Sequence, residues 1–219
     1  MGFVITIDGP AASGKSSVSR GLSKKLSIPW VSTGAFYRGL GYAAIHSHID
    51  LDDKVALSEL AMSNVWRVVM TPEKTQVWFK DRDVTGEIAQ EEVGNVASRI
   101  SHYPEVRGSL LDSQRQCALV DRGLVAEGRD CGTVVFPQAE VKIYLTADSE
   151  FRAQRRAQEL GMDEKALALQ QKQRDEQDST RKTAPLQIPK DALVVDTTLM
   201  SLEDVIEKIY DFALTKLRT

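Results

Sequence analysis

The chain has 219 residues, enough for one sizeable α/β domain with room for a small appended unit. Apolar residues make up 42% of the sequence and charged residues 27%, and 28 basic against 31 acidic residues give a net charge of −3. This balance is ordinary for a globular protein and excludes an overall electrostatic attraction to nucleic acid or to a membrane surface.

The first elements predict half of a βαβ unit. The run Phe3–Asp8 is apolar and rich in β-branched residues, and it stops at a Gly-Pro pair, which is typical of a buried strand. The following segment Lys15–Leu26 carries apolar residues at every fourth position, which predicts a helix with one buried face. A strand, a glycine-rich loop and a helix therefore follow one another at the start of the chain.

The next segments indicate an insertion into this α/β pattern. A short strand at Trp30–Ser32 and a helix at Thr33–His46 still fit the pattern. The runs Val65–Thr71 and Gln76–Lys80 instead read as two short strands around a Thr-Pro-Glu-Lys turn, which predicts an antiparallel hairpin. We place an inserted subdomain at about residues 50–115, ending with helices near Gln90–Ser101 and Pro104–Cys117.

The alternating pattern then returns. Three apolar runs read as strands: Leu124–Glu127, Val141–Thr146 and Leu193–Asp196. Ser201 begins a capping-box pattern ahead of a closing helix with an apolar stripe. Strands that alternate with helices predict a parallel sheet with right-handed crossovers and helices on both faces.

The strongest motif follows the first strand. Residues 9–16 fit G-x-x-x-x-G-K-[ST] at every fixed position, which predicts a P-loop whose backbone amides surround the phosphates of a nucleoside triphosphate. Lys15 is placed to bridge the β- and γ-phosphate oxygens, and the Ser16 hydroxyl to bind Mg²⁺. The predicted ATP-binding residues are Gly9, Pro10, Ala11, Ala12, Ser13, Gly14, Lys15, Ser16 and Ser17.

The motif alone does not separate a kinase from a GTPase or an ATPase. Asp83-Val84-Thr85-Gly86 fits the D-x-x-G pattern of GTPases, but it falls in the expected hairpin insertion, and the sequence contains no N-K-x-D motif. We therefore assign residues 83–86 to a turn.

Arginines downstream are spaced for phosphoryl transfer, which needs positive charge around the transferred group. Arg152, Arg155 and Arg156 share one helix face, and Arg174, Asp178 and Arg181 share another. A Leu-Gly-Met-Asp break lies between them, so a hinged lid at about residues 152–181 is predicted. The alternative is a pair of solvated helix surfaces with intrahelical salt bridges.

The sequence resembles the bacterial cytidylate kinases over nearly its whole length. The resemblance rests on four segments: Ile5–Pro10 leading into the P-loop, Thr33–Arg38, Glu127–Pro137 and Arg181–Leu186. It implies a P-loop NTPase core at residues 1–49 and 116–219, an inserted monophosphate-binding subdomain containing a small antiparallel sheet, and a short helical lid. It also implies a Mg²⁺-dependent transfer of the ATP γ-phosphoryl group to CMP or dCMP.

The resemblance further implies roles for individual residues. Thr33, Arg38 and Arg129 match contacts to the acceptor phosphate. Ser98, Arg107 and Asp130 match positions that read cytosine, and Asp178 and Arg181 match contacts to the acceptor's sugar and phosphate. With Lys15, the arginines that match lid and transfer-site positions form the expected catalytic set: Lys15, Arg155, Arg156 and Arg174.

The sequence is also compatible with two other functions. The acceptor can be another small molecule, such as UMP, AMP or a non-nucleotide, because only the base-reading residues separate these kinases. The chain can also be a nucleotide-binding protein that no longer catalyses, although such a protein is expected to have lost Lys15, Ser16 or a lid arginine. We expect a monomer with no nucleic-acid or membrane partner. The N-terminus resembles no signal peptide, and Cys117 and Cys131 lack metal-like spacing, which favours reduced thiols in the cytoplasm.

Overall fold

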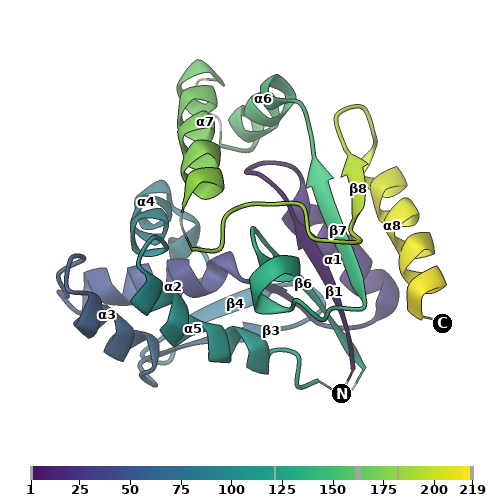
Figure 1. Ribbon diagram of the computed structural model, residues 1–219. Coiled ribbons are helices and arrows are strands. Elements are labelled where there is room, and N and C mark those ends of the chain that lie inside the picture. Colours follow the sequence, from purple (N-terminus) through teal and green to yellow (C-terminus); the bar gives the residue numbers. More distant parts are fainter. Residues whose placement is uncertain (1, 121, 161–163, 182, 218–219) are drawn as a thin grey trace.

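A computed structural model of the protein describes residues 2–120, 122–160, 164–181 and 183–217 (Figure 1). Its centre is a five-stranded sheet in the order β2-β6-β1-β7-β8, in which every pairing is parallel. The strands are β1 (Phe3–Asp8), β2 (Trp30–Ser32), β6 (Gly123–Gly128), β7 (Val141–Thr146) and β8 (Leu193–Asp196). The predicted parallel sheet is thus confirmed, with β1 in the middle and the P-loop leaving its carboxyl end.

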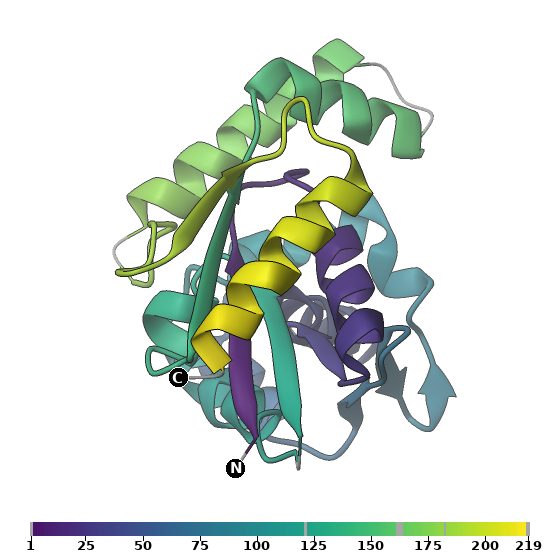
Figure 2. The same ribbon diagram turned by 90° about the vertical axis from the view of Figure 1, so that its right-hand side faces the viewer.

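Side chains of β1 alternate between two hydrophobic clusters, one on each face of the sheet. Ile5 and Ile7 pack with residues of α1 (Lys15–Leu26) and α8 (Leu202–Leu217), whereas Val4 packs on the opposite face. Figure 2 shows α8 lying across the front of the sheet. The cap predicted for α8 is present, because the Ser201 hydroxyl accepts a hydrogen bond from the Asp204 amide at 3.1 Å.

The second face is covered by three helical segments, α2 (Gly34–His46), α5 (Pro104–Gln116) and the single π-helical turn η2 (Cys131–Val135). Short π-helical segments are uncommon and often occur near functional sites. No sequence pattern predicts η2, because one turn is too short to show an apolar period.

The segment between α2 and α5 contains the antiparallel sheet that the hairpin pattern predicted. Its strands are β3 (Trp66–Met70), β4 (Thr75–Phe79) and β5 (Arg82–Asp83), and its helices are α3 (Lys54–Ala61), η1 (Glu87–Ala89) and α4 (Glu91–Ile100). The third strand, β5, was not predicted because it has only two residues. Asp83 ends it and accepts the Thr85 amide at 2.9 Å, so the D-x-x-G segment forms a turn beside the small sheet, away from the P-loop.

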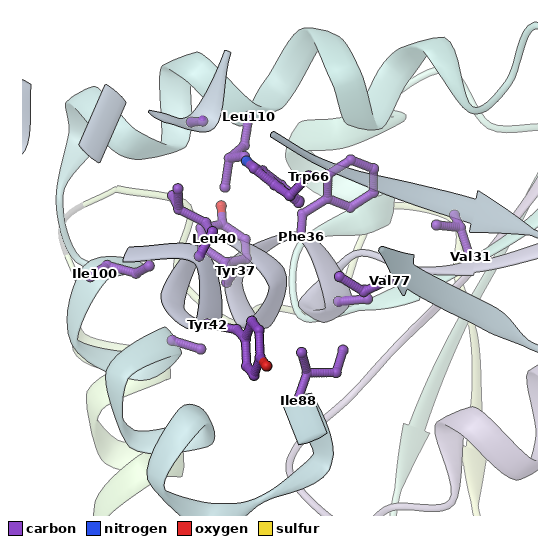
Figure 3. Packing of buried hydrophobic residues seen from close by; sticks show 14 of the residues in the cluster. Val31, Phe36, Tyr37, Leu40, Tyr42, Trp66, Val77, Ile88, Ile100 and Leu110 are labelled. Carbon is purple, nitrogen blue, oxygen red and sulfur yellow. The ribbon is translucent and has the colours of Figure 1, made fainter. Parts of the chain in front are cut away.

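The small sheet shares one hydrophobic cluster with α2 and α5 (Figure 3). Trp66 of β3 lies edge-on against Phe36 of α2, with ring centroids 6.3 Å apart. A Cβ on Gly39 would lie 2.9 Å from the Trp66 ring, so this glycine allows the close approach. The boundaries predicted for an inserted subdomain, 50 and 115, stay predictions, because α2 and the small sheet share this core.

Two helices lie above the carboxyl ends of the sheet strands, α6 (Ser149–Leu160) and α7 (Glu164–Thr180) (Figure 1). They occupy the place of the predicted lid. Arg181 falls one residue beyond α7, although its amide still donates to the Gln177 carbonyl at 3.1 Å. Among the helices of the described residues, none is long and apolar enough to span a membrane.

Candidate active site

The P-loop joins β1 to α1 through backbone conformations that few residues other than glycine adopt. Gly9 and Gly14 have φ angles of 152° and 87°. A Cβ on Gly9 would lie 2.2 Å from the Leu145 carbonyl oxygen, so only glycine fits between β1 and β7 there. The Ser13 hydroxyl donates to the Pro10 carbonyl at 3.1 Å and closes the loop on itself. The predicted arrangement of strand, loop and helix is therefore confirmed.

Lys15 folds back over the loop. Its Nζ donates to the Pro10 carbonyl at 2.6 Å, and the residue is only 8% exposed. Burial, together with the positive charge of Arg129, lowers the pKa of Lys15 to about 7, while the Glu127 carboxylate opposes this shift. The negative charge of a bound triphosphate would raise the pKa of Lys15 again and so restore its positive charge.

Ser16 points toward the carboxyl end of β6. Its hydroxyl donates to Oε1 of Glu127 at 3.0 Å. A hydroxyl beside a carboxylate is a pair of hard oxygen donors of the kind that Mg²⁺ prefers. The described residues contain no cluster of three or more His, Cys, Asp or Glu side chains that could hold a metal. A site that relies on one or two protein oxygens fits an ion that arrives with nucleotide phosphates.

A carboxylate from α7 contacts the P-loop. Oδ1 of Asp175 accepts the Ala11 amide at 3.1 Å, and Oδ2 pairs with Nη1 of Arg152 at 2.5 Å. Arg152 also donates to the Ala11 carbonyl at 2.9 Å. Asp175 therefore occupies a P-loop amide of the kind that binds phosphate. The same contact holds α7 against the P-loop. No sequence pattern indicates this role for Asp175, although the residue directly follows one of the predicted arginines, Arg174.

Arg155 holds the loop that follows β8. Its guanidinium donates to the Thr197 carbonyl at 2.6 Å and to the Thr197 hydroxyl at 3.2 Å. Arg155 and Thr197 line a cavity of about 560 Å³ together with P-loop residues 12–14 and Ser17. The side chains of Arg156 and Arg174 lie outside the described residues.

A second cavity of about 270 Å³ lies on the other side of the P-loop. It begins at Lys15 and Ser16 and continues between α2, α4, α5 and the end of β6. All eight residues predicted to bind the acceptor line this cavity: Thr33, Arg38, Ser98, Arg107, Arg129, Asp130, Asp178 and Arg181. The structure therefore brings together residues that lie up to about 150 positions apart in the sequence.

The inner end of the cavity is a buried ionic cluster. Asp130 lies between Arg107, which hydrogen-bonds its Oδ2, and Arg181, whose Nη2 lies 3.7 Å from its Oδ1. All three side chains are buried: Arg107 is 8% exposed, Asp130 7% and Arg181 6%. Nη2 of Arg181 is buried and has no hydrogen-bond partner among the described residues. A buried donor without a partner costs free energy, so the cluster is suited to a polar ligand.

Arg129 links the P-loop to α7. Its Nη1 donates to the Gly9 carbonyl at 2.8 Å, and its Nε donates to Oδ2 of Asp178 at 2.6 Å. Burial, the largest single influence, would lower the pKa of Arg129, but the charge and hydrogen bond of Asp178, together with the charges of Asp175 and Glu127, outweigh burial and the pKa is raised. This guanidinium therefore stays charged between the P-loop and the cavity.

The remaining acceptor residues are Arg38 of α2, Thr33 just before α2 and Ser98 of α4. Arg38 donates to the carbonyls of Ile88 and Gln90 at 2.6 and 3.2 Å, and Gly94 leaves room for its guanidinium. The Thr33 hydroxyl donates to the Glu127 carbonyl at 3.0 Å, so a contact with a phosphate would require the hydroxyl to turn.

Comparison with known proteins gives the family. Residues 5–215 match the cytidylate kinase family model. The chain is 61% identical over 217 residues to a cytidylate kinase of Bdellovibrio bacteriovorus, covering 99% of this chain and all of that protein. It is 43% identical over 219 residues to a cytidylate kinase of Salmonella choleraesuis, covering 98% and 96% of the two chains.

Solved structures agree on the fold. TT1252 of Thermus thermophilus superposes with a TM-score of 0.51 at 17% identity, covering 99% of this chain and 98% of that one. A gluconokinase of Sinorhizobium meliloti gives a TM-score of 0.52 at 13% identity, with 99% and 94% covered. These identities establish a shared fold alone, whereas the sequence matches establish descent. The chain belongs to the cytidylate kinase family.

Proposed function

We propose that the protein transfers the γ-phosphoryl group of ATP to CMP or dCMP and releases CDP or dCDP. The protein is a member of the cytidylate kinase family, and one observation of its structure supports this proposal most directly. A single cavity runs from the P-loop residues Lys15 and Ser16 to the buried cluster around Asp130. The donor phosphates and a nucleotide acceptor can thus meet at Lys15.

On the donor side, the P-loop amides bind the β-phosphate at the positive end of α1. Lys15 neutralises the negative charge that develops between the β- and γ-phosphates. The positive charge of the lysine stabilises the transition state most strongly in a buried site. Arg129 borders both sides, because it touches Gly9 and lines the acceptor cavity. We assign lid arginines, including Arg155, Arg156 and Arg174, to the remaining phosphate charge.

Mg²⁺ would be held by Ser16, with Glu127 beside it, and by the phosphates themselves. When bound, the ion would supply positive charge that offsets the negative charge of the triphosphate. The carboxylate of Asp8 instead accepts two backbone amides, one on each oxygen.

On the acceptor side, Asp130 explains a preference for cytosine. Its carboxylate accepts from the exocyclic amine of cytosine, whereas the corresponding oxygen of uracil would be repelled. Arg107 holds this carboxylate in place, and Ser98 lines the same cavity. A site built around one specific hydrogen bond rejects a base that leaves buried polar groups unpaired, typically by about 10²-fold or more.

A panel of acceptors tests the proposal. ADP formation is measured with ATP, Mg²⁺ and each of CMP, dCMP, UMP and AMP in turn. We expect kcat/KM for CMP and dCMP to exceed that for UMP and AMP by about 10²-fold or more. A preference for UMP or AMP would replace the acceptor, and no turnover with any nucleotide would favour a binding protein. A monomeric state and a cytoplasmic location remain predictions that sedimentation and cell fractionation can test.

A further inference from the structure

Asp8, the last residue of β1, is a fully buried carboxylate that the proposed reaction does not use. Its Oδ1 accepts the Cys131 amide at 2.8 Å, and its Oδ2 accepts the Gly132 amide at 2.7 Å. Burial raises the pKa of Asp8 to about 6, although these two hydrogen bonds oppose the shift. Burying a carboxylate costs free energy of folding, so a carboxylate in this position points to a role for its two hydrogen bonds.

The segment that Asp8 holds carries the acceptor site. Cys131 and Gly132 directly follow Arg129 and Asp130, both of which line the acceptor cavity. The fit is close, because a Cβ on Gly132 would lie 2.8 Å from the Thr6 hydroxyl and 3.2 Å from Oδ2 of Asp8.

Asp8 also joins this segment to the P-loop. The next residue, Gly9, begins the loop, and its carbonyl accepts the Arg129 guanidinium at 2.8 Å. Asp8 and Gly9, where β1 meets the P-loop, therefore hold the acceptor segment at two points, once through a side chain and once through the backbone.

We propose that Asp8 is a positioning residue for acceptor selection: by binding the two amides at the start of η2, it sets Asp130 and Arg129 at the correct place relative to the P-loop. This inference rests on the proposed function. Asp8 touches no substrate, and it acts through the backbone that follows Asp130. A displacement of about 1 Å at such a segment can cost a large factor in rate, because catalysis depends on alignment.

The chemistry explains why a carboxylate is needed. Two successive amides present two N–H donors, and a carboxylate offers one oxygen to each. Asparagine has the same shape but only one oxygen, and its NH₂ group would face an N–H. Asp8→Asn therefore leaves the core volume unchanged and releases one end of the segment.

The test compares Asp8→Asn with the wild type and with Glu140→Gln. The control is matched, because Oε2 of Glu140 accepts the Val4 amide at 2.8 Å near the other end of β1, away from the cavity. We expect Asp8→Asn to raise the KM for CMP about tenfold and to lower the CMP/UMP ratio of kcat/KM about fivefold. The KM for ATP should change less than about twofold, and Glu140→Gln should change none of these values.

The outcomes separate this inference from the proposed function. If the wild type prefers another nucleotide, the proposed function fails. The effect of Asp8→Asn on the ratio of kcat/KM for that nucleotide to kcat/KM for the others still tests the role of Asp8. A folded Asp8→Asn with an unchanged ratio and an unchanged acceptor KM would overturn the inference, because a merely structural residue would lower only the amount of active protein. Should Asp8→Asn not fold, Gly132→Ala pushes the same amide away, and we expect the same loss of selection. If neither variant folds, Asp8 serves folding and the inference is wrong.

Discussion

The donor half of the site, residues 9–17, is one continuous segment, whereas the acceptor half is assembled from residues between Thr33 and Arg181. The two halves also satisfy their polar groups differently. In the donor half, Lys15 and Ser13 both donate to the Pro10 carbonyl of their own loop. In the acceptor half, Asp130 depends on arginines from α5 and from the end of α7.

The two properties of a kinase are therefore encoded differently in the sequence. Phosphate binding needs backbone amides in a fixed local conformation, which a short motif can specify. Base selection needs side chains that converge from several elements, so it depends on the packing of the whole acceptor half. We therefore expect donor-side changes to alter the rate with every acceptor, and acceptor-side changes to alter the choice of acceptor.

The largest effect is expected at Lys15. Lys15→Met removes the charge that is needed most in the transition state, so kcat should fall by about 10²–10⁴-fold, or about 3–5 kcal/mol. The fall should be equal for CMP and UMP. Steady-state kinetics of the folded variant measure it, with Lys25→Met as the control, because Lys25 lies on the same helix but pairs with Glu207 at the surface. Retention of more than about a tenth of the wild-type kcat would contradict the role given to Lys15.

The next effect concerns the acceptor half. Asp130→Asn should lower kcat/KM for CMP by about tens-fold and that for UMP far less, because an amide can donate to the uracil oxygen. ATP affinity should hardly change. Asp52→Asn is the matched control, since it weakens another Asp–Arg pair, with Arg99, on the exposed side of the same region. An unchanged CMP/UMP ratio in Asp130→Asn would show that this carboxylate does not read the base.

The two halves also differ in how far the sequence predicted them. The P-loop and its flanking elements β1 and α1 were predicted with the correct bounds, because the glycine positions and the apolar period are local signals. The acceptor residues were named only by resemblance, and no pattern indicates that Arg107 pairs with Asp130. The contacts of Asp8 and Asp175 were missed, since hydrogen bonds between residues more than 120 positions apart leave no periodic trace.

The pH dependence of ATP binding tests the lowered pKa of Lys15 in the donor half. Lys15 has a pKa of about 7 in the folded protein, below the ordinary 10.5, and bound phosphates should raise it again. Above about pH 7, the ATP complex then holds more protons than the free protein, so ATP affinity should fall as pH rises, by at most about tenfold per unit. Below that pH, Lys15 is charged in both states and contributes no dependence.

Calorimetry of ATP binding near pH 8, in buffers of different ionisation enthalpy, measures this proton uptake. We expect up to about one proton to be taken up per ATP in the wild type and much less in Lys15→Met. An equal uptake in both proteins would assign the proton to another group.

The smallest effect is expected where α7 meets the P-loop. The Asp175 carboxylate accepts the Ala11 amide and pairs with Arg152, so an ATP phosphate must displace it from that amide. Asp175→Asn weakens this competitor, because a neutral oxygen is a poorer acceptor and no longer pairs with the guanidinium. ATP should then bind about threefold to tenfold more tightly, which corresponds to about 0.7–1.4 kcal/mol.

Hydrogen exchange in α7 of the free variant should also become faster, because one contact that holds the helix down is lost. Glu176→Gln provides the control, since that neighbouring side chain is exposed and should change neither value. Weaker ATP binding in Asp175→Asn would reverse the interpretation: the carboxylate would then serve the bound state by holding Arg152 against the P-loop. Because the acceptor half does not contain Asp175, the CMP/UMP ratio should stay constant in either case. A change in that ratio would mean that the donor and acceptor halves are coupled through α7, which also carries Asp178.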